Sequence, residues 1–345
     1  MNNDQTRKLH ISSSGAKLPP RQRGINRRGF LKTAGCTGVG FALAFVPRRT
    51  FAEKSEPLPT RILGRTKEKV SILGLGTAPV GEGPPDVEEG IRIFSEAIDR
   101  GVTYVDTARI YGNAEEILGH IIPKRRDKLF VVSKVSTDNA DRAERSLSES
   151  LRRLKTDYLD LVHIHSIGSK KIDRVLAKDG ALEYLLKQKE KGNIRFIGIS
   201  GHNRPPNFVR MLQTDQIDVV MCVINHADRN IYDFESKVLT KAKERNVGCA
   251  AMKVYAGIKG GFRNHRSGHI GCATEPAYLP QALAYALDLK GVSVAVVGPY
   301  TIEQAIQNVQ FARKYKPLTQ VQRASLLKYG QKLAETLGPR YGPIV

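Results

Sequence analysis

The sequence predicts a single (β/α)8 barrel, a TIM barrel, preceded by an N-terminal segment that lies outside the fold. The chain has 345 residues, which is enough for one barrel of about 250 residues with extensions. From about residue 60, short runs rich in β-branched residues alternate with amphipathic helical stretches. There are eight such runs, and a closed parallel barrel needs eight.

The expected strands are apolar over nearly their whole length, which is typical of parallel strands buried on both faces. They are Val70–Leu75, Thr103–Asp106, Leu129–Lys134, Leu159–His165, Ile194–Ser200, Val219–Ile224, Gly248–Met252 and Val292–Val297. The helical stretches between them include 87–100, 141–154, 181–191, 233–245 and 302–314. A last helix over 321–336 has no strand after it, so we expect it to pack outside or against the barrel.

An open, doubly wound sheet is the alternative arrangement of the same elements. Such a sheet usually carries a Gly-x-Gly-x-x-Gly loop after its first strand. Here the first strand is followed by Gly74-Leu75-Gly76-Thr77-Ala78-Pro79, which lacks the third glycine. We expect Pro79 to disrupt a helix start at this point, and the closed barrel is therefore preferred.

Charge and cysteine content exclude several classes of protein. The formal net charge is +21, and residues 1–52 hold ten Lys or Arg against one acidic residue. The basic residues of 53–345 are spread over periodic helices without a nucleic-acid motif, so we expect no nucleic-acid partner. None of the four cysteines lies in a Cys-x-x-Cys pair, so neither a zinc site nor a redox pair is indicated. Cys222 and Cys249 are expected to be buried thiols.

The N-terminal segment resembles a twin-arginine export signal. Asn26-Arg27-Arg28-Gly29-Phe30-Leu31-Lys32 is similar to the Ser/Thr-Arg-Arg-x-Phe-Leu-Lys motif, and an apolar run over 38–46 follows. Thr50-Phe51-Ala52 then offers a small-x-small cleavage site. The apolar run is much shorter than the roughly 20 residues of a membrane span. We therefore expect a signal segment over 1–52, a barrel over 53–345, the twin-arginine translocation machinery as a partner, and a periplasmic location.

Four polar residues fall at successive strand ends, where barrel enzymes place their active sites. Asp106 and Tyr111 follow the second strand, Lys134 closes the third and His165 closes the fourth. A lysine beside a tyrosine favours the phenolate, so we expect Lys134 to lower the pKa of Tyr111. A carboxylate can hold such a lysine charged and in place. Together these residues could donate a proton near neutral pH.

These residues resemble the aldo-keto reductase family, over roughly residues 60–315. Asp106-Thr107-Ala108-x-x-Tyr111-Gly112 is similar to the family's Asp-Thr-Ala-x-x-Tyr-Gly signature, and Lys134 to its Ser-Lys motif. Residues 157–165 are similar to Asp-Tyr-x-Asp-Leu-x-x-x-His, and 61–77 to its opening hairpin and first strand. The resemblance implies an oxidoreductase that uses NADP or NAD to reduce a small aldehyde or ketone to an alcohol, and we expect a monomer. The resemblance also implies that Tyr111 donates the proton and that His165 orients the carbonyl. Lys134 and Asp106 would adjust the pKa of Tyr111.

The resemblance also implies a cofactor pocket, in which several positions depart from the family's usual residues. Ser200 keeps its place, but Gly201 replaces Asn, Met221 replaces Gln, and Met252 stands where an aromatic often stacks on the nicotinamide. The segment 298–308 resembles the family's phosphate and adenine segment. The expected cofactor-binding residues are Gly76, Thr77, Ser200, Met252, Lys253, Gly298, Gln304 and Asn308. Lys253 is expected to contact the pyrophosphate of the cofactor.

Three further interpretations remain open. A non-catalytic barrel could bind the nicotinamide cofactor as a sensor. A metal-dependent hydrolase could use His163 and His165, although no third ligand follows at the later strand ends, so we expect no metal. The polar, basic segment 257–277 could lie over the barrel mouth as a lid, or it could be a solvated loop.

Overall fold

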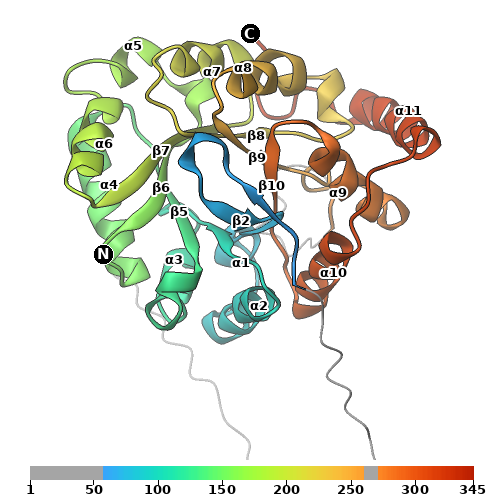
Figure 1. The fold of residues 1–345 in the computed structure, drawn as a ribbon, viewed down its shortest axis with the longest axis horizontal. Helices are drawn as coiled ribbons and strands as arrows, with labels where there is room; N and C mark the ends of the chain where they lie inside the picture. The colour runs from blue at the N-terminus through green and yellow to red at the C-terminus, as the bar shows by residue number, and fades with distance from the viewer. Residues whose placement is uncertain (1–56, 260–270) are drawn as a thin grey trace, which may run out of the picture. The chain divides into compact units, whose positions relative to one another are not determined.

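The computed structural model describes residues 57–259 and 271–345, which form a closed barrel of eight parallel strands (Figure 1). The hydrogen-bonded order around the barrel is β10-β3-β4-β5-β6-β7-β8-β9, so each strand pairs with its neighbours in sequence and the first pairs with the last. The strands are β3 (Leu73–Gly76), β4 (Tyr104–Asp106), β5 (Phe130–Val135), β6 (Leu159–Ile164), β7 (Ile194–Gly201), β8 (Val219–Val223), β9 (Gly248–Met252) and β10 (Val292–Val297). The predicted fold class is confirmed.

The first expected strand is in fact two strands with different roles. β2 (Lys69–Ser71) pairs antiparallel with β1 (Thr60–Ile62), and only β3 enters the barrel. The sequence pattern does not mark this break, because Val70, Ile72 and Leu73 on either side of it are all apolar. The hairpin β1–β2 lies at the amino ends of the strands, because Ser293 in β10 donates a hydrogen bond to the carbonyl of Ile62. The opposite, carboxyl ends of the strands are left for the site.

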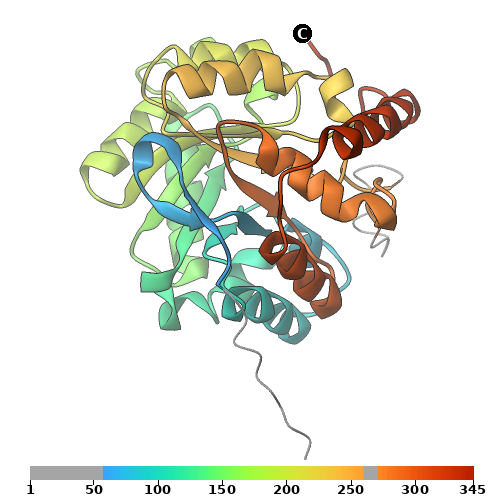
Figure 2. The ribbon, with the colours of Figure 1, turned by 45° about the vertical axis from the view of Figure 1, so that its right-hand side comes forward.

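Helices surround the barrel, and several pack against one another along its outside (Figures 1 and 2). They are α1 (Ala78–Glu82), α2 (Val87–Asp99), α3 (Ala114–Leu118), α4 (Ala140–Leu154), α5 (Ile172–Val175), α6 (Ala181–Glu190), α7 (Pro205–Leu212), α8 (Thr240–Glu244), α9 (Leu279–Asp288), α10 (Ile302–Arg313) and α11 (Gln320–Leu337). The last helix, α11, packs on α9 outside the barrel, as predicted. The predicted helix over 233–245 begins as a π-helical turn, Glu235–Leu239, before α8.

The expectation that Pro79 would prevent a helix was wrong. Pro79 lies in the first turn of α1, where a proline lacks no hydrogen bond that the helix would otherwise make. The helix is only five residues long, but it turns the chain across the carboxyl end of β3. It therefore places Glu82 at the mouth of the barrel.

The barrel core is built from the alternating apolar residues of the strands and the inner faces of the helices. α2 shows how the sequence directs this packing, since Gly90, Ile93, Phe94 and Ala97 share its buried face. The helix begins at Asp86, whose side chain accepts a hydrogen bond from the backbone of Glu89. Among the described residues, no helix is both long and apolar enough to cross a bilayer.

Candidate active site

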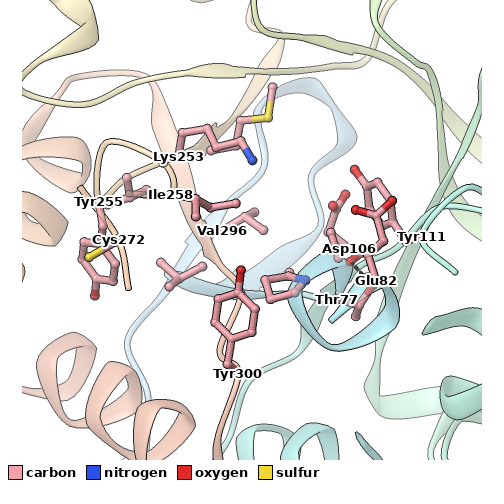
Figure 3. Close-up of a pocket in the computed structure, with 18 of the residues that line it drawn as sticks. Thr77, Glu82, Asp106, Tyr111, Lys253, Tyr255, Ile258, Cys272, Val296 and Tyr300 are labelled. Atoms are coloured by element: carbon pink, nitrogen blue, oxygen red, sulfur yellow. Dashed lines mark hydrogen bonds between the residues drawn. The ribbon is translucent and has the colours of Figure 1, made fainter. Parts of the chain in front are cut away.

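A cavity of about 350 Å³ opens at the carboxyl ends of the strands (Figure 3). Its walls come from the ends of β3, β4, β6, β9 and β10 and from the loops that follow them. Of the predicted tetrad, Asp106, Tyr111 and His165 line this central cavity. Lys134 lies behind them, almost wholly buried. The structure thus brings the four predicted residues together.

Asp106 and Lys134 form a buried ion pair beneath the cavity. The Nζ of Lys134 lies 2.6 Å from Oδ1 of Asp106 and donates a second hydrogen bond, of 2.7 Å, to the carbonyl of Thr107. The Lys134 side chain is 1% exposed and the Asp106 side chain is 4% exposed. Burial raises the pKa of Asp106 and lowers the pKa of Lys134, and the attraction between the two charges opposes both shifts. The second oxygen, Oδ2 of Asp106, has no hydrogen-bond partner among the described residues.

Tyr111 lies above this pair, with the Nζ of Lys134 at 4.7 Å from the centre of its ring. Contrary to the sequence-based expectation, the pKa of Tyr111 is raised well above its ordinary value. Burial is the largest cause, and the negative charges of Asp106 and Glu82 add to it. These raising effects outweigh the lowering that was expected from Lys134. Tyr111 is therefore a fully protonated phenol.

His165 faces Tyr111 across the cavity, edge to face, with 5.9 Å between the ring centres. Burial and the nearby charge of Lys134 lower the pKa of His165 to about 3. The imidazole is therefore neutral at physiological pH and can donate one hydrogen bond without surrendering a proton. Its Nδ1 has no hydrogen-bond partner among the described residues.

His163, the other histidine of the hydrolase alternative, does not share this cavity. Its ring is fully buried and packs against Gly198, where an added Cβ would lie 2.3 Å from Nδ1. Within 57–259 and 271–345, no three acidic, histidine or cysteine side chains are grouped as metal ligands would be. The two histidines therefore do not form a shared site that opens on the cavity.

Seven of the eight predicted cofactor residues line the same cavity. They are Gly76, Thr77, Met252, Lys253, Gly298, Gln304 and Asn308. Ser200 is the exception: it is 1% exposed, lies outside the lining, and its Oγ has no hydrogen-bond partner among the described residues. Met221, at the position of the family's glutamine, also lines the cavity.

The helix α10 begins at the cavity wall. Its N-cap Thr301 accepts a hydrogen bond from the backbone of Gln304, and Asn308 accepts one of 2.9 Å from the hydroxyl of Tyr255. Gly298 precedes the helix, and a Cβ there would lie 2.6 Å from the ring of Pro79. The glycine thus allows β10 and α1 to approach each other closely. An α-helix N-terminus at a cavity wall suits an anionic ligand.

Glu82, His202, Cys272 and Tyr300 are among the cavity residues that the sequence did not predict for the site. Glu82 reaches the cavity only because α1 crosses the mouth, and Figure 3 shows it near Asp106 and Tyr111. His202 directly follows β7 and Tyr300 lies three residues after β10, so the position of each beyond a strand end was the available signal. Cys272 pairs by backbone with Ile258 at the base of the expected lid, while 260–270 lie outside the described residues.

The comparisons with known proteins agree with this geometry. The sequence profile of the Aldo/keto reductase family matches residues 72–326. An uncharacterised oxidoreductase of Bacillus subtilis is 27% identical over 285 residues, which cover 73% of this chain and 90% of that protein. The match to L-galactose dehydrogenase from Arabidopsis thaliana is 33% identical over 154 residues, but it spans only 41% of this chain and 48% of that enzyme.

Solved structures of similar proteins have the same fold. The holo form of an aldo-keto reductase from Bacillus halodurans has a TM-score of 0.64 and 26% identity, covering 80% of this chain and 96% of that one. An aldo-keto reductase from Klebsiella pneumoniae in complex with NADPH has a TM-score of 0.63 and 25% identity, and the match covers 79% of this chain and 95% of that one. The fold, the grouped strand-end residues and the match over most of the chain together show that this protein belongs to the aldo/keto reductase family of oxidoreductases.

Proposed function

We propose that the protein reduces an aldehyde or ketone to an alcohol with NADPH or NADH, and that Tyr111 donates the proton. The observation that carries this proposal is the grouping at the cavity floor. The Asp106–Lys134 ion pair lies directly beneath the ring of Tyr111, and Tyr111 shares the cavity with His165. A protonated phenol and a neutral imidazole at one site suit the protonation of a carbonyl oxygen.

The cavity residues fit a nicotinamide dinucleotide. Figure 3 shows the amine of Lys253 pointing into the cavity, where it could meet the pyrophosphate, and the N-terminus of α10 offers a second anion-binding group. Ser200 is not part of this fit, because it is buried outside the cavity lining. The Bacillus and Klebsiella relatives were solved in a holo form and with NADPH, respectively. A bound nicotinamide would supply the hydride.

The four residues of the tetrad have different roles in the protonation of the carbonyl oxygen. Tyr111 keeps its proton until negative charge develops on the substrate oxygen, because burial and the charges of Asp106 and Glu82 raise its pKa. Lys134 then lies close enough to stabilise the phenolate, and Asp106 holds Lys134 in place. His165 is too weakly basic to hold a second proton, so it orients the carbonyl oxygen and leaves proton donation to Tyr111.

The proposal is tested by following the oxidation of NADPH and of NADH with a panel of small aldehydes and ketones. The panel includes neutral, hydroxylated and carboxylated compounds. We expect turnover of at least one carbonyl compound with one of the two nucleotides. Tight binding of a nucleotide without turnover of any compound would instead support a sensor.

Removal of the Glu82 charge should change the pH dependence of reduction. Glu82 raises the pKa of Tyr111, and reduction requires the protonated phenol. Activity is therefore lost as pH rises through this pKa, and Glu82→Gln should move that loss to lower pH. The control is Glu88→Gln on the exposed side of α2, which should keep the wild-type profile. Identical kcat/KM profiles for Glu82→Gln and wild type would contradict the role of Glu82.

We also propose that residues 1–52, which lie outside the described residues, direct export of the folded protein to the periplasm. The order of the twin-arginine motif, the apolar run and the cleavage site supports this proposal. The double substitution Arg27→Lys and Arg28→Lys should retain an uncleaved precursor in the cytoplasm. Arg48→Lys with Arg49→Lys, outside the motif, serves as the control. Cell fractionation with antibody detection decides, and an unchanged periplasmic fraction would contradict the proposal.

A further inference from the structure

The end of the chain returns to the barrel mouth after α11. Arg340 and Tyr341 pack there, with the guanidinium carbon of Arg340 at 4.3 Å from the centre of the Tyr341 ring. The backbone of Tyr341 donates a 2.7 Å hydrogen bond to the hydroxyl of Tyr232, and its ring lies 5.1 Å from that of His202. His202 lines the central cavity. This terminal segment is thus joined to the loops that form the site.

Arg340 makes a bidentate ion pair with Asp228, which lies 112 residues earlier. The two hydrogen bonds measure 2.9 and 2.8 Å, and the side chains are 12% and 1% exposed. A planar guanidinium suits this two-point contact with a carboxylate. The same guanidinium donates a further 2.9 Å hydrogen bond to the carbonyl of Ala256. Arg340 therefore bridges the loop after β8 to the loop after β9.

Asn225 connects Asp228 to Lys253 by hydrogen bonds. The amide nitrogen of Asn225 donates to Oδ2 of Asp228 at 2.7 Å and to the carbonyl of Lys253 at 2.9 Å. The amide oxygen of Asn225 accepts from the backbone of Asp228 at 2.8 Å. Asn225 and Asp228 are almost completely buried. The loop after β9 is therefore held at both Lys253 and Ala256.

The loop after β9 contains two residues in an unfavourable backbone conformation. Lys253 and Ala256 have φ angles of +56° and +57°, in the left-handed region that side chains with a Cβ disfavour. Residues in such conformations persist where surrounding contacts fix them, and they gather at functional sites. Here Lys253, Val254, Tyr255, Gly257 and Ile258 all line the central cavity.

We propose that Arg340 is a positioning residue for nucleotide binding, which acts by holding the loop Lys253–Ile258 in its cavity-lining shape through Asp228 and Asn225. The inference rests on the proposed function, since it assigns this loop to the nucleotide. Arg340 does not touch the reacting groups. Its loss should therefore weaken nucleotide binding more than it slows the chemical step.

The first test measures hydrogen exchange in the full-length protein without nucleotide. The backbone amide of Ala256 donates to Lys253, and that of Thr274 donates to Tyr255, so both amides report on the loop. In Arg340→Met these amides should exchange at least about tenfold faster than in wild type, as expected for the loss of hydrogen bonds to a charged group. The control is Arg323→Met in α11, whose ion pair with Asp288 lies away from the cavity. Unchanged exchange in folded Arg340→Met would overturn the proposal.

The second test titrates NADPH and NADH by calorimetry and compares KM with kcat. Arg340→Met should raise the Kd and the KM for the nucleotide about tenfold, with kcat changed less than twofold, whereas Arg323→Met should match wild type. A wild-type affinity in Arg340→Met would overturn the positioning role. If wild type binds neither nucleotide, the proposed function fails, and the exchange result alone decides whether Arg340 holds the loop. If Arg340→Met does not fold, Arg340→Lys replaces it and should show smaller effects in the same directions.

Discussion

Tyr111→Phe should lower kcat for carbonyl reduction by about 10²–10⁴-fold, the range that a general acid contributes. The substitution removes only the phenol oxygen, so the ring still covers Lys134 and still faces His165. Neither His165 nor Lys134 replaces the lost proton donor, because His165 is neutral and Lys134 donates to Asp106 and Thr107. Steady-state kinetics at saturating nucleotide measure the effect.

Tyr104→Phe is a matched control for this substitution. Tyr104 is fully buried in β4, does not line the cavity, and its hydroxyl has no hydrogen-bond partner among the described residues. Its loss should leave kcat within about twofold of wild type. Equal turnover by Tyr111→Phe and Tyr104→Phe would show that Tyr111 is not the acid.

Asp106→Asn should destabilise the protein and also impair reduction. The substitution leaves Lys134 buried without its counter-ion, and breaking a buried ion pair in this way costs about 3–5 kcal/mol. Urea denaturation measures the loss in the free energy of unfolding. Turnover should fall as well, because Lys134 would no longer be held under the ring of Tyr111.

The double variant Asp106→Asn with Lys134→Met separates stability from catalysis. Replacing both charges leaves no unpaired buried ion, so the free energy of unfolding should recover by several kcal/mol, about the loss given for a broken pair. Turnover should stay low, because the cation beneath the ring of Tyr111 is lost. Recovery of both properties would mean that the ion pair serves structure alone.

Much of the fold could be predicted because burial on both faces makes each barrel strand an apolar run with clear ends. Asp106, Lys134 and His165 could be placed for the same reason, since each lies at or next to the end of a strand. The resemblance implied an opening hairpin, but the position of the break between hairpin and barrel within 70–75 could not be predicted, because Val70, Ile72 and Leu73 are all apolar. α1 was missed because Pro79 was treated as a helix breaker rather than as a first-turn residue.

The electrostatics of the site could be predicted only in part. The sequence identifies Lys134 and Tyr111 as neighbours, but the sign of the Tyr111 pKa shift depends on burial and on the positions of Asp106 and Glu82. The contact between Arg340 and Asp228 joins residues 112 positions apart, and no local pattern indicates it. Such features need the folded chain, because distance in space rather than spacing in sequence determines them.

Direct hydride transfer from the nucleotide is tested by following the hydrogen that reduces the substrate. A carbonyl compound turned over by the enzyme is incubated with nucleotide deuterated at the nicotinamide C4, and the alcohol is analysed by mass spectrometry and NMR. We expect one deuterium on the former carbonyl carbon, transferred from the labelled face of the nicotinamide. An alcohol without deuterium at that carbon, from either C4 epimer of the nucleotide, would contradict direct hydride transfer.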